Sequence, residues 1–194
     1  MEYFKQGLSL NEEVTNLICL RQEGSFWDFK KQWYTNKSDM LHDIICMSNN
    51  LSNRTAYIII GIDEQQDYSI VDVSCDPNRK NTQKLVDFLK DKKFAGGIRP
   101  VVHVESLHYS NGVIDTIVIE NSSNTPFYLT AQYEGVRASS IYTRVMDTNT
   151  PIDKSADINH VEQLWRKRFH LDDTPIEKFR YYLRSPDDWN TIQD

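Results

Sequence analysis

The stretch "AYIIIGIDE", residues 56–64, decides how the rest of the chain is interpreted. Its first seven residues are almost wholly apolar and rich in isoleucine, a composition typical of a strand buried on both faces. We therefore expect this strand to lie at the centre of a sheet. Asp63 and Glu64 end the stretch, so two carboxylates are expected where the buried strand meets solvent.

The segments around this strand predict a chain of mixed helices and strands. Ser9 and Glu12 have the spacing of a capping box at the start of a first helix. Asn111 and Gly112 separate two apolar, β-prone segments and predict a hairpin turn. The predicted helices cover 9–24, 38–50 and 82–94, and the predicted strands cover 26–34, 56–62, 101–109, 113–120 and 139–145. This order predicts an α/β (α+β) fold in which a mixed β-sheet is flanked by helices.

The pattern becomes purely helical after residue 155. Amphipathic helices are predicted over 157–169 and 174–183, and the second begins with the capping signals Thr174, Pro175 and Glu177. We therefore expect one α/β domain over residues 1–153 and a C-terminal helical extension over residues 154–194. The extension is expected either to dock by its apolar face or to pair with another chain.

The composition excludes several classes of protein. The 194 residues contain no apolar run long enough to span a bilayer, and the first ten residues lack a secretory signal, so no membrane association and a cytoplasmic location are expected. Three cysteines without CxxC spacing argue against a disulfide framework and a cysteine zinc site. Cys19 and Cys46 are expected to be packed within helices. The net charge of −6 requires that any nucleic-acid contact use a local basic surface.

A second stretch, "EGSFWDFKKQWY" at residues 23–34, carries the residues that could support chemistry. Strand alternation places Asp28 and Lys30 on one face. If this strand neighbours the buried one, Asp28 and Glu23 lie close to the acids at 63–64. Carboxylates are the ligands that Mg²⁺ and Mn²⁺ prefer, and a lysine beside them can bind phosphate. The alternative is an exposed strand edge that happens to be charged.

Several ordered motifs together resemble one family. They are E-x4-DFK at 23–30, "HDIICMSNN" at 42–50, "YIIIGIDE" at 57–64, "PFYL" at 126–129 and "SSIYTRVMDTNTP" at 139–151. In this combination the chain resembles the Schlafen-type AlbA-like domain family over roughly residues 10–153.

The resemblance implies an α/β nucleic-acid-binding module that takes RNA, such as tRNA, or DNA. Some Schlafen proteins are metal-dependent endoribonucleases with a Glu-x4-Glu pair and a later aspartate. Carried over to this sequence, the catalytic and metal-binding acids are Glu23, Asp28 and either Asp63 or Glu64, with Mg²⁺ or Mn²⁺ as the metal. Asp28 stands where those nucleases have a longer glutamate.

The same resemblance points to basic contacts and to a partner. The residues expected to contact nucleic acid are Lys30, Lys31, Arg144, Arg166, Lys167 and Arg168. Schlafen nucleases combine two related lobes in one chain, whereas this chain has one, so a homodimer is expected. Three functions stay open. The first is an endoribonuclease acting on structured RNA, and the second is a non-catalytic RNA- or DNA-binding or regulatory module that dimerises. The third is a dimerisation and scaffold domain whose charged strand is only a surface.

Overall fold

A computed structural model describes residues 8–183. The first seven residues of the predicted domain (1–7) and the last eleven of the predicted extension (184–194) lie outside the described residues. A mixed sheet of four strands forms the centre of the molecule, in the order β1-β2-β6-β5. The strands are β1 (Trp27–Lys30), β2 (Ala56–Ile60), β5 (Val102–Tyr109) and β6 (Gly112–Ile119). β1 and β2 run parallel and the other pairs run antiparallel. The predicted mixed sheet with flanking helices is confirmed.

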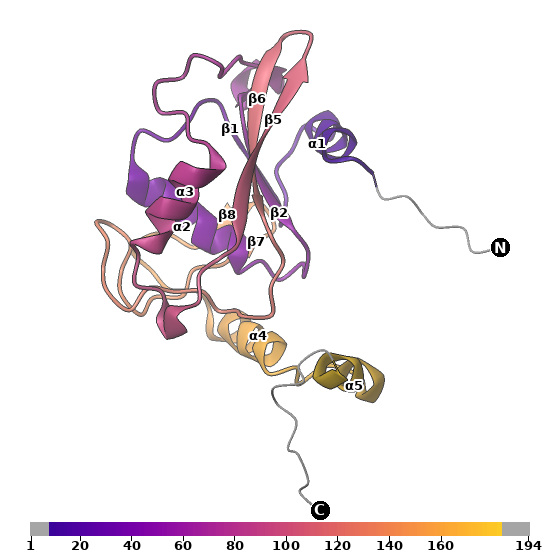
Figure 1. The fold of residues 1–194 in the computed structure, drawn as a ribbon, viewed down its shortest axis with the longest axis vertical. Coiled ribbons are helices and arrows are strands. Elements are labelled where there is room, and N and C mark those ends of the chain that lie inside the picture. Colours follow the sequence, from indigo (N-terminus) through magenta and orange to yellow (C-terminus); the bar gives the residue numbers. More distant parts are fainter. Residues whose placement is uncertain (1–7, 184–194) are drawn as a thin grey trace, which may run out of the picture.

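Helices cover both faces of the sheet (Figure 1). α1 (Leu10–Cys19) lies against one face, and α2 (Lys37–Ser48) and α3 (Thr82–Lys90) lie against the other. The core on the side of α2 and α3 includes Trp33, Ile44, Ile58, Leu85 and Ile117, and the core on the side of α1 includes Val14, Leu17, Phe29, Ile59 and Ile114. The sheet is therefore buried on both faces, as the apolar sequence of β2 predicts.

The buried strand is shorter than predicted because the chain turns at Gly61. Gly61 has a φ of 109°, and a Cβ there would lie 2.8 Å from the carbonyl oxygen of Val71. Beyond it the chain leaves the main sheet and forms the short ladder of β3 (Ile62–Asp63) and β4 (Ser69–Ile70), joined by the 3₁₀ turn η1 (Glu64–Gln66). This turn sets the positions of the acids at 63–64.

Other predicted boundaries also differ. The capping box at Ser9 is present, but α1 ends at Cys19, soon before Arg21 adopts a left-handed φ of 51°. Cys46 is buried as expected, but the expectation for Cys19 is wrong: it is exposed, because α1 buries only the stripe that faces the sheet. The strand predicted over 139–145 is reduced to β7 (Arg144–Val145), which pairs with β8 (Thr148–Asn149). A second 3₁₀ turn, η2 (Ala95–Gly97), follows α3.

Two helices form the end of the described chain, α4 (Ile158–Arg168) and α5 (Pro175–Leu183). α4 docks on the domain through buried Leu164, whose carbonyl oxygen accepts a 3.0 Å hydrogen bond from Thr125. α5 buries no residue and lies farther from the sheet (Figure 1). No helix within residues 8–183 combines the length and apolar character needed to cross a membrane.

Candidate nucleic-acid site

Glu23 and Asp28 share one site at the edge of the sheet. Asp28 lies on edge strand β1, opposite Ile58, with its side chain on the α2 face and only 2% of the residue exposed. Glu23 precedes the strand, and its Oε1 accepts a 3.0 Å hydrogen bond from the backbone N–H of Phe29. This bond folds Glu23 back beside Asp28. The spacing of five residues thus brings the two carboxylates together.

Arg144 holds the two carboxylates from a distant part of the sequence. Its Nη2 donates to Glu23 Oε2 at 2.8 Å, and its Nη1 lies 3.2 Å from Asp28 Oδ1. Its Nε donates to the carbonyl oxygen of Gly24 at 2.7 Å. Arg144 is only 2% exposed, so its structural role is to orient the carboxylates from within the protein. Arg144 is the first residue of β7, so this short strand supplies the guanidinium.

Lys30 extends the site toward solvent. Its ammonium group forms an ion pair with Asp28 Oδ2 and lies 3.5 Å from Asp43 Oδ2. The side chain of Lys30 is 31% exposed, whereas that of Asp28 is 3% exposed. Lys30 is therefore the cation of this cluster that an incoming phosphate can reach.

Three further residues complete the hydrogen-bond network, and sequence reasoning missed all of them. Asp43, on α2, accepts a 2.7 Å hydrogen bond from Tyr34 Oη and a 2.8 Å bond from Asn149 Nδ2. The Oδ1 of Asn149 in turn accepts a 3.0 Å bond from Arg144 Nη1. One signal was available for Asp43: it is an acid within a helix whose neighbouring residues are apolar and buried. Nothing in the sequence marks Asn149 as its partner.

The acids of the cluster differ in the direction of their pKa shifts. Burial raises the pKa of Glu23 to about 7, with hydrogen bonding to Asp28 and its negative charge adding to the rise. Burial also acts to raise the pKa of Asp43, but the hydrogen bond of His42 and the charge of Lys30 outweigh it, so that pKa is lowered. Burial alone would lower the pKa of Lys30, but the charges of Asp28 and Asp43 outweigh it and raise that pKa. Glu23 is the acid that changes protonation near neutral pH.

The two acids after β2 take different places. Asp63 Oδ2 pairs with Lys31 Nζ at 2.8 Å, and the hydrogen bond from Lys31 lowers the pKa of Asp63. Glu64 is exposed as a whole, but its carboxyl group is partly shielded from water. This partial loss of solvation, and then the negative charge of Asp28, raises the pKa of Glu64. Of these two acids, Glu64 is therefore the one whose charge interacts with Asp28.

The carboxylate oxygens that could hold a divalent cation are already engaged by the protein. All four carboxylate oxygens of Glu23 and Asp28 already face protein donors, namely the Phe29 amide, Arg144 and Lys30. Within the described part of the chain, no group of three or more His, Cys, Asp or Glu side chains is arranged to hold a metal ion. In this arrangement the acids suit Mg²⁺ or Mn²⁺ chemically, but their geometry does not fit the ion.

The basic residues predicted on the C-terminal extension make contacts with their own surroundings. Arg166 pairs with Asp172, Lys167 Nζ donates to Asn121 at 2.8 Å, and Arg168 Nη1 donates to the carbonyl oxygen of Asn124 at 2.8 Å. These contacts tie α4 to the segment after β6 and to the turn before α5.

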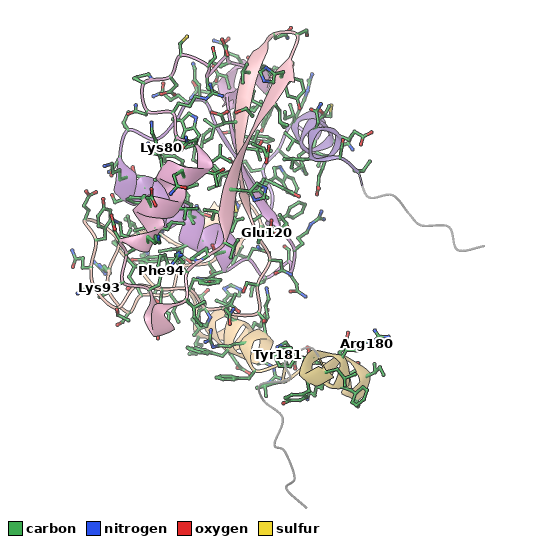
Figure 2. The ribbon with its side chains drawn as sticks, viewed as in Figure 1. Lys80, Lys93, Phe94, Glu120, Arg180 and Tyr181 are labelled. Atoms are coloured by element: carbon green, nitrogen blue, oxygen red, sulfur yellow. The ribbon has the colours of Figure 1, made fainter. Side chains whose placement is uncertain are left out.

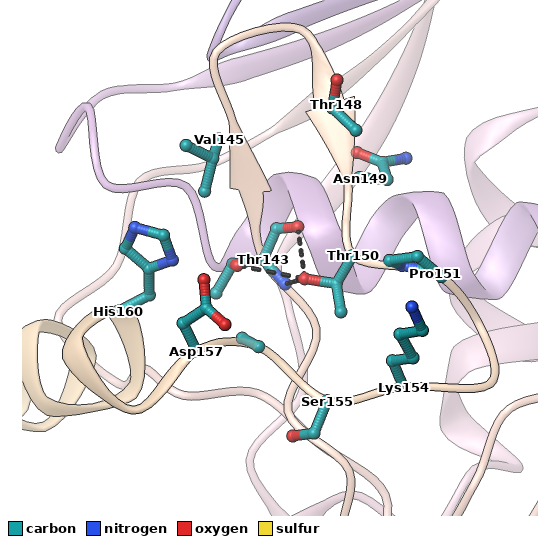
Figure 3. A pocket seen from close by; sticks show the side chains of 11 residues that line it. Thr143, Val145, Thr148, Asn149, Thr150, Pro151, Lys154, Ser155, Asp157 and His160 are labelled. Carbon is teal, nitrogen blue, oxygen red and sulfur yellow. Dashed lines mark hydrogen bonds between the residues drawn. The ribbon is translucent and has the colours of Figure 1, made fainter.

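A pocket of mixed polar and apolar lining adjoins the carboxylate site through Asn149. It measures about 370 Å³ and lies between the β7–β8 hairpin and the start of α4. Figure 3 shows Lys154 and His160 on its two sides, with the hydrogen-bonded hydroxyls of Thr143 and Thr150 between them. The candidate site thus opens beside a surface lined with hydroxyl, amide and basic groups.

The comparison with protein families identifies the family that the sequence motifs resemble. A family profile described as "Schlafen, AlbA_2" matches residues 23–153, more than half of the chain. The chain belongs to the Schlafen AlbA_2 family. The matched segment begins at Glu23 and contains Asp28, Lys30 and Arg144, and membership of this family suggests a nucleic-acid-binding role. Neither the curated proteins nor the solved structures give a significant match.

Proposed function

We propose that this Schlafen AlbA_2 protein binds structured RNA, such as tRNA, and cleaves it at the carboxylate site. One observation carries the proposal: half-buried Glu23 and buried Asp28 share a site with Lys30, which reaches solvent. With Asp43, three carboxylates share the two cations Arg144 and Lys30, so the cluster holds one more acid than its ion pairs require.

The chemistry of phosphodiester cleavage suits these groups. A water molecule or a ribose hydroxyl must lose a proton as its oxygen bonds to phosphorus, and the phosphate gains negative charge in the transition state. The bond from phosphorus to the leaving ribose oxygen breaks, and that oxygen takes a proton from solvent. Glu23, whose pKa is about 7, can accept that proton at neutral pH. Lys30 can leave Asp28 for the phosphate and stabilise its charge. Arg144 stays within the protein and keeps Glu23 oriented.

The metal expected from the resemblance is a separate part of this proposal. The present arrangement of the described acids does not fit Mg²⁺ or Mn²⁺. Once their protein donors were displaced, Glu23 and Asp28, with Asp63 or Glu64 as the third acid, would hold the ion, which would supply Lewis-acid activation of the phosphate or of water. Binding would require Lys30 or Arg144 to release its carboxylate oxygen, so no step above depends on the ion. Cleavage that EDTA abolishes and Mn²⁺ restores would support metal dependence.

A specific observation favours a second function, a non-catalytic RNA- or DNA-binding or regulatory module. The carboxylate oxygens of Glu23 and Asp28 are saturated by protein donors, which is also how a purely structural ion-pair network is built. In that case Lys30 and Lys31 would contact phosphate and no bond would be cut.

One experiment separates the two functions. The full chain, the Glu23→Gln variant and the control Glu105→Gln, which changes an exposed acid on β5, are incubated with labelled tRNA with and without Mn²⁺. We expect wild type and control to cleave equally, while Glu23→Gln binds RNA but cleaves roughly 10²–10⁴-fold more slowly. Binding without cleavage by wild type would leave the non-catalytic function, and no binding at low salt would refute both.

We further propose that two copies of the chain pair through α5. The apolar side chains of α5 support pairing with a second copy: Ile176 and Phe179 are 57% and 59% exposed. Light scattering should give a dimer for wild type and a monomer for the double variant Ile176→Ser and Phe179→Ser. A monomeric wild type would contradict the pairing.

A further inference from the structure

A second basic surface lies at the start of α3, away from the carboxylate site. A pocket of about 300 Å³ opens there, lined by Arg79, Lys80, Asn81, Lys84, Val104 and Ser106. Figure 2 shows Lys80 at one end of α3 and Lys93 toward the other end. None of the pocket residues was singled out in the sequence, because the basic residues there are spread over a loop and two helix starts.

The charge of this pocket is only partly compensated. Arg79 is engaged by the buried carboxylate of Asp115, with Nε donating at 2.7 Å and Nη2 at 2.8 Å. Lys37 and Lys84 are exposed, and Lys80 lies 5.6 Å from the ring centre of Trp33. Burial, and then the positive charge of Lys37 and Lys84, lowers the pKa of Lys80. The three lysines therefore repel one another, and a bound anion would relieve that repulsion.

The negative groups that face the lysines do not cancel this charge. Asp76 acts on Lys80 to raise its pKa, but the lysine charges and burial together exceed this effect. The carboxylate of Asp76 also accepts hydrogen bonds from the backbone N–H groups of Trp33 and Asn78, at 2.8 Å each. The pocket is thus a local positive surface on a chain whose net charge is −6.

The backbone adds charge of the same sign. Lys37 is the first residue of α2, and Lys80 directly precedes Asn81, the N-cap of α3. The N-terminus of a helix carries a partial positive charge. Both helices therefore place this end beside the lysine cluster, where it strengthens the attraction for an anion.

A short segment connects the pocket to the carboxylate site. In this segment Lys30 and Tyr34 contact Asp28 and Asp43, while Trp33 lies beneath Lys80. Residues 30–37 can span at most about 25 Å when fully extended. One turn of a nucleic-acid duplex is about 34 Å long, so one bound molecule can reach both places.

We propose that the pocket lined by Lys80 and Lys84, with the charge of Lys37 acting on it, binds a backbone phosphate of the same nucleic acid that contacts Lys30. This inference rests on the proposed function and assigns it a second contact point. The pocket would fix the register of the nucleic acid and would not take part in cleavage. Its ligand is a phosphodiester group, recognised by charge and independent of base sequence.

The test measures the affinity of the full chain for a labelled RNA hairpin at several KCl concentrations. The test variant is Lys37→Ala with Lys84→Ala, since both lysines are exposed. The matched control is Lys90→Ala with Lys93→Ala, which removes the same charge at the other end of α3, where Lys90 is the last helical residue. We expect the test variant to bind roughly tenfold more weakly, with a salt slope smaller by about 1, and the control to bind as wild type does.

The possible outcomes test the phosphate pocket separately from the proposed nucleic-acid binding. If wild type binds and both double variants bind equally well, the phosphate pocket is refuted while nucleic-acid binding stands. If wild type does not bind the hairpin, both are refuted. Inorganic pyrophosphate serves as a second probe: if the test variant loses affinity for pyrophosphate and keeps its affinity for RNA, the pocket binds a small anion and the inference fails.

Discussion

Two clusters in this protein pair an arginine with a buried aspartate. They differ in how many carboxylates share the arginine: one in the Arg79 cluster and two in the Arg144 cluster. Asp115, on β6, receives hydrogen bonds from Arg79, Trp33 and Ser106, and these donors outweigh burial and lower its pKa. In the other cluster Arg144 is shared between Glu23 and Asp28, and the pKa of Glu23 is raised to about 7. The same kinds of group therefore give opposite shifts.

The difference teaches how to tell a structural ion pair from a candidate functional site. The clusters are close, since Lys30 and Asp115 both lie opposite Ile60 of the central strand. One carboxylate with a full set of donors stays charged and stabilises the fold. Two carboxylates that share one guanidinium leave one acid poised to exchange a proton.

The largest expected effect is the removal of Arg144. The Arg144→Ala variant would leave half-buried Glu23 and buried Asp28 with one fewer cation, and should lower the free energy of unfolding by about 3–5 kcal/mol. Urea unfolding at neutral pH measures this effect. A loss below about 1 kcal/mol would mean that the two acids do not depend on the guanidinium.

The matched change in the other cluster should cost less. In Arg79→Ala, Asp115 keeps Trp33 and Ser106 as donors, so we expect a loss of about 1–3 kcal/mol by the same measurement. If Arg79→Ala proved more damaging than Arg144→Ala, the ranking of the two clusters would be wrong.

The two clusters should also respond differently to pH. The folded pKa of Glu23 is raised from 4.5 to about 7, so the folded state binds more protons between those values. Stability from this group is then full below pH 4.5 and falls by about 2–3 kcal/mol as pH rises to 7. The lowered pKa of Asp115 acts only below about pH 3.8.

Unfolding measured in urea between pH 4.5 and 7.5 checks this difference. Glu23→Gln should remove most of the decline, and Asp115→Asn should leave it in place. A decline of equal size in all three proteins would place its origin outside the carboxylate site.

The smallest effect on stability is expected at Lys30. Lys30→Met keeps the apolar stem of the side chain, and Asp28 still has Arg144, so unfolding should change by about 1 kcal/mol or less. RNA binding should nevertheless lose about 1 unit of salt slope, because a phosphate contact is gone. An unchanged slope would remove Lys30 from the nucleic-acid surface.

The sequence predicts those parts of this account that depend on local pattern. The apolar run of β2 predicts its central place, and strand alternation predicts that Asp28 and Lys30 share a face. The turn at Gly61 was not predicted, because it depends on the close approach of Val71 and Ile114. It is this turn that pairs Asp63 with Lys31 and leaves Glu64 facing the cluster.

Contacts between distant segments were harder to predict. Arg144 was expected either to orient the carboxylates or to bind phosphate, and only the folded chain brings its guanidinium to Glu23. Asp43 and Asn149 join the network because α2 packs against the β7–β8 hairpin. No local sequence pattern predicts a contact between these two residues. The cluster of Lys37, Lys80 and Lys84 was not predicted either, because these lysines come from separate segments that only the fold brings together.

The most direct test of the comparison is the titration of the Glu23 carboxyl group by ¹³C NMR, with its signal assigned by comparison with the Glu23→Gln variant. The account predicts a midpoint near pH 7, since Glu23 is buried beside Asp28 and shares Arg144 with it. A midpoint near the ordinary glutamate value of about 4.3 would show that Glu23 is a charged structural partner like Asp115, and would contradict the account.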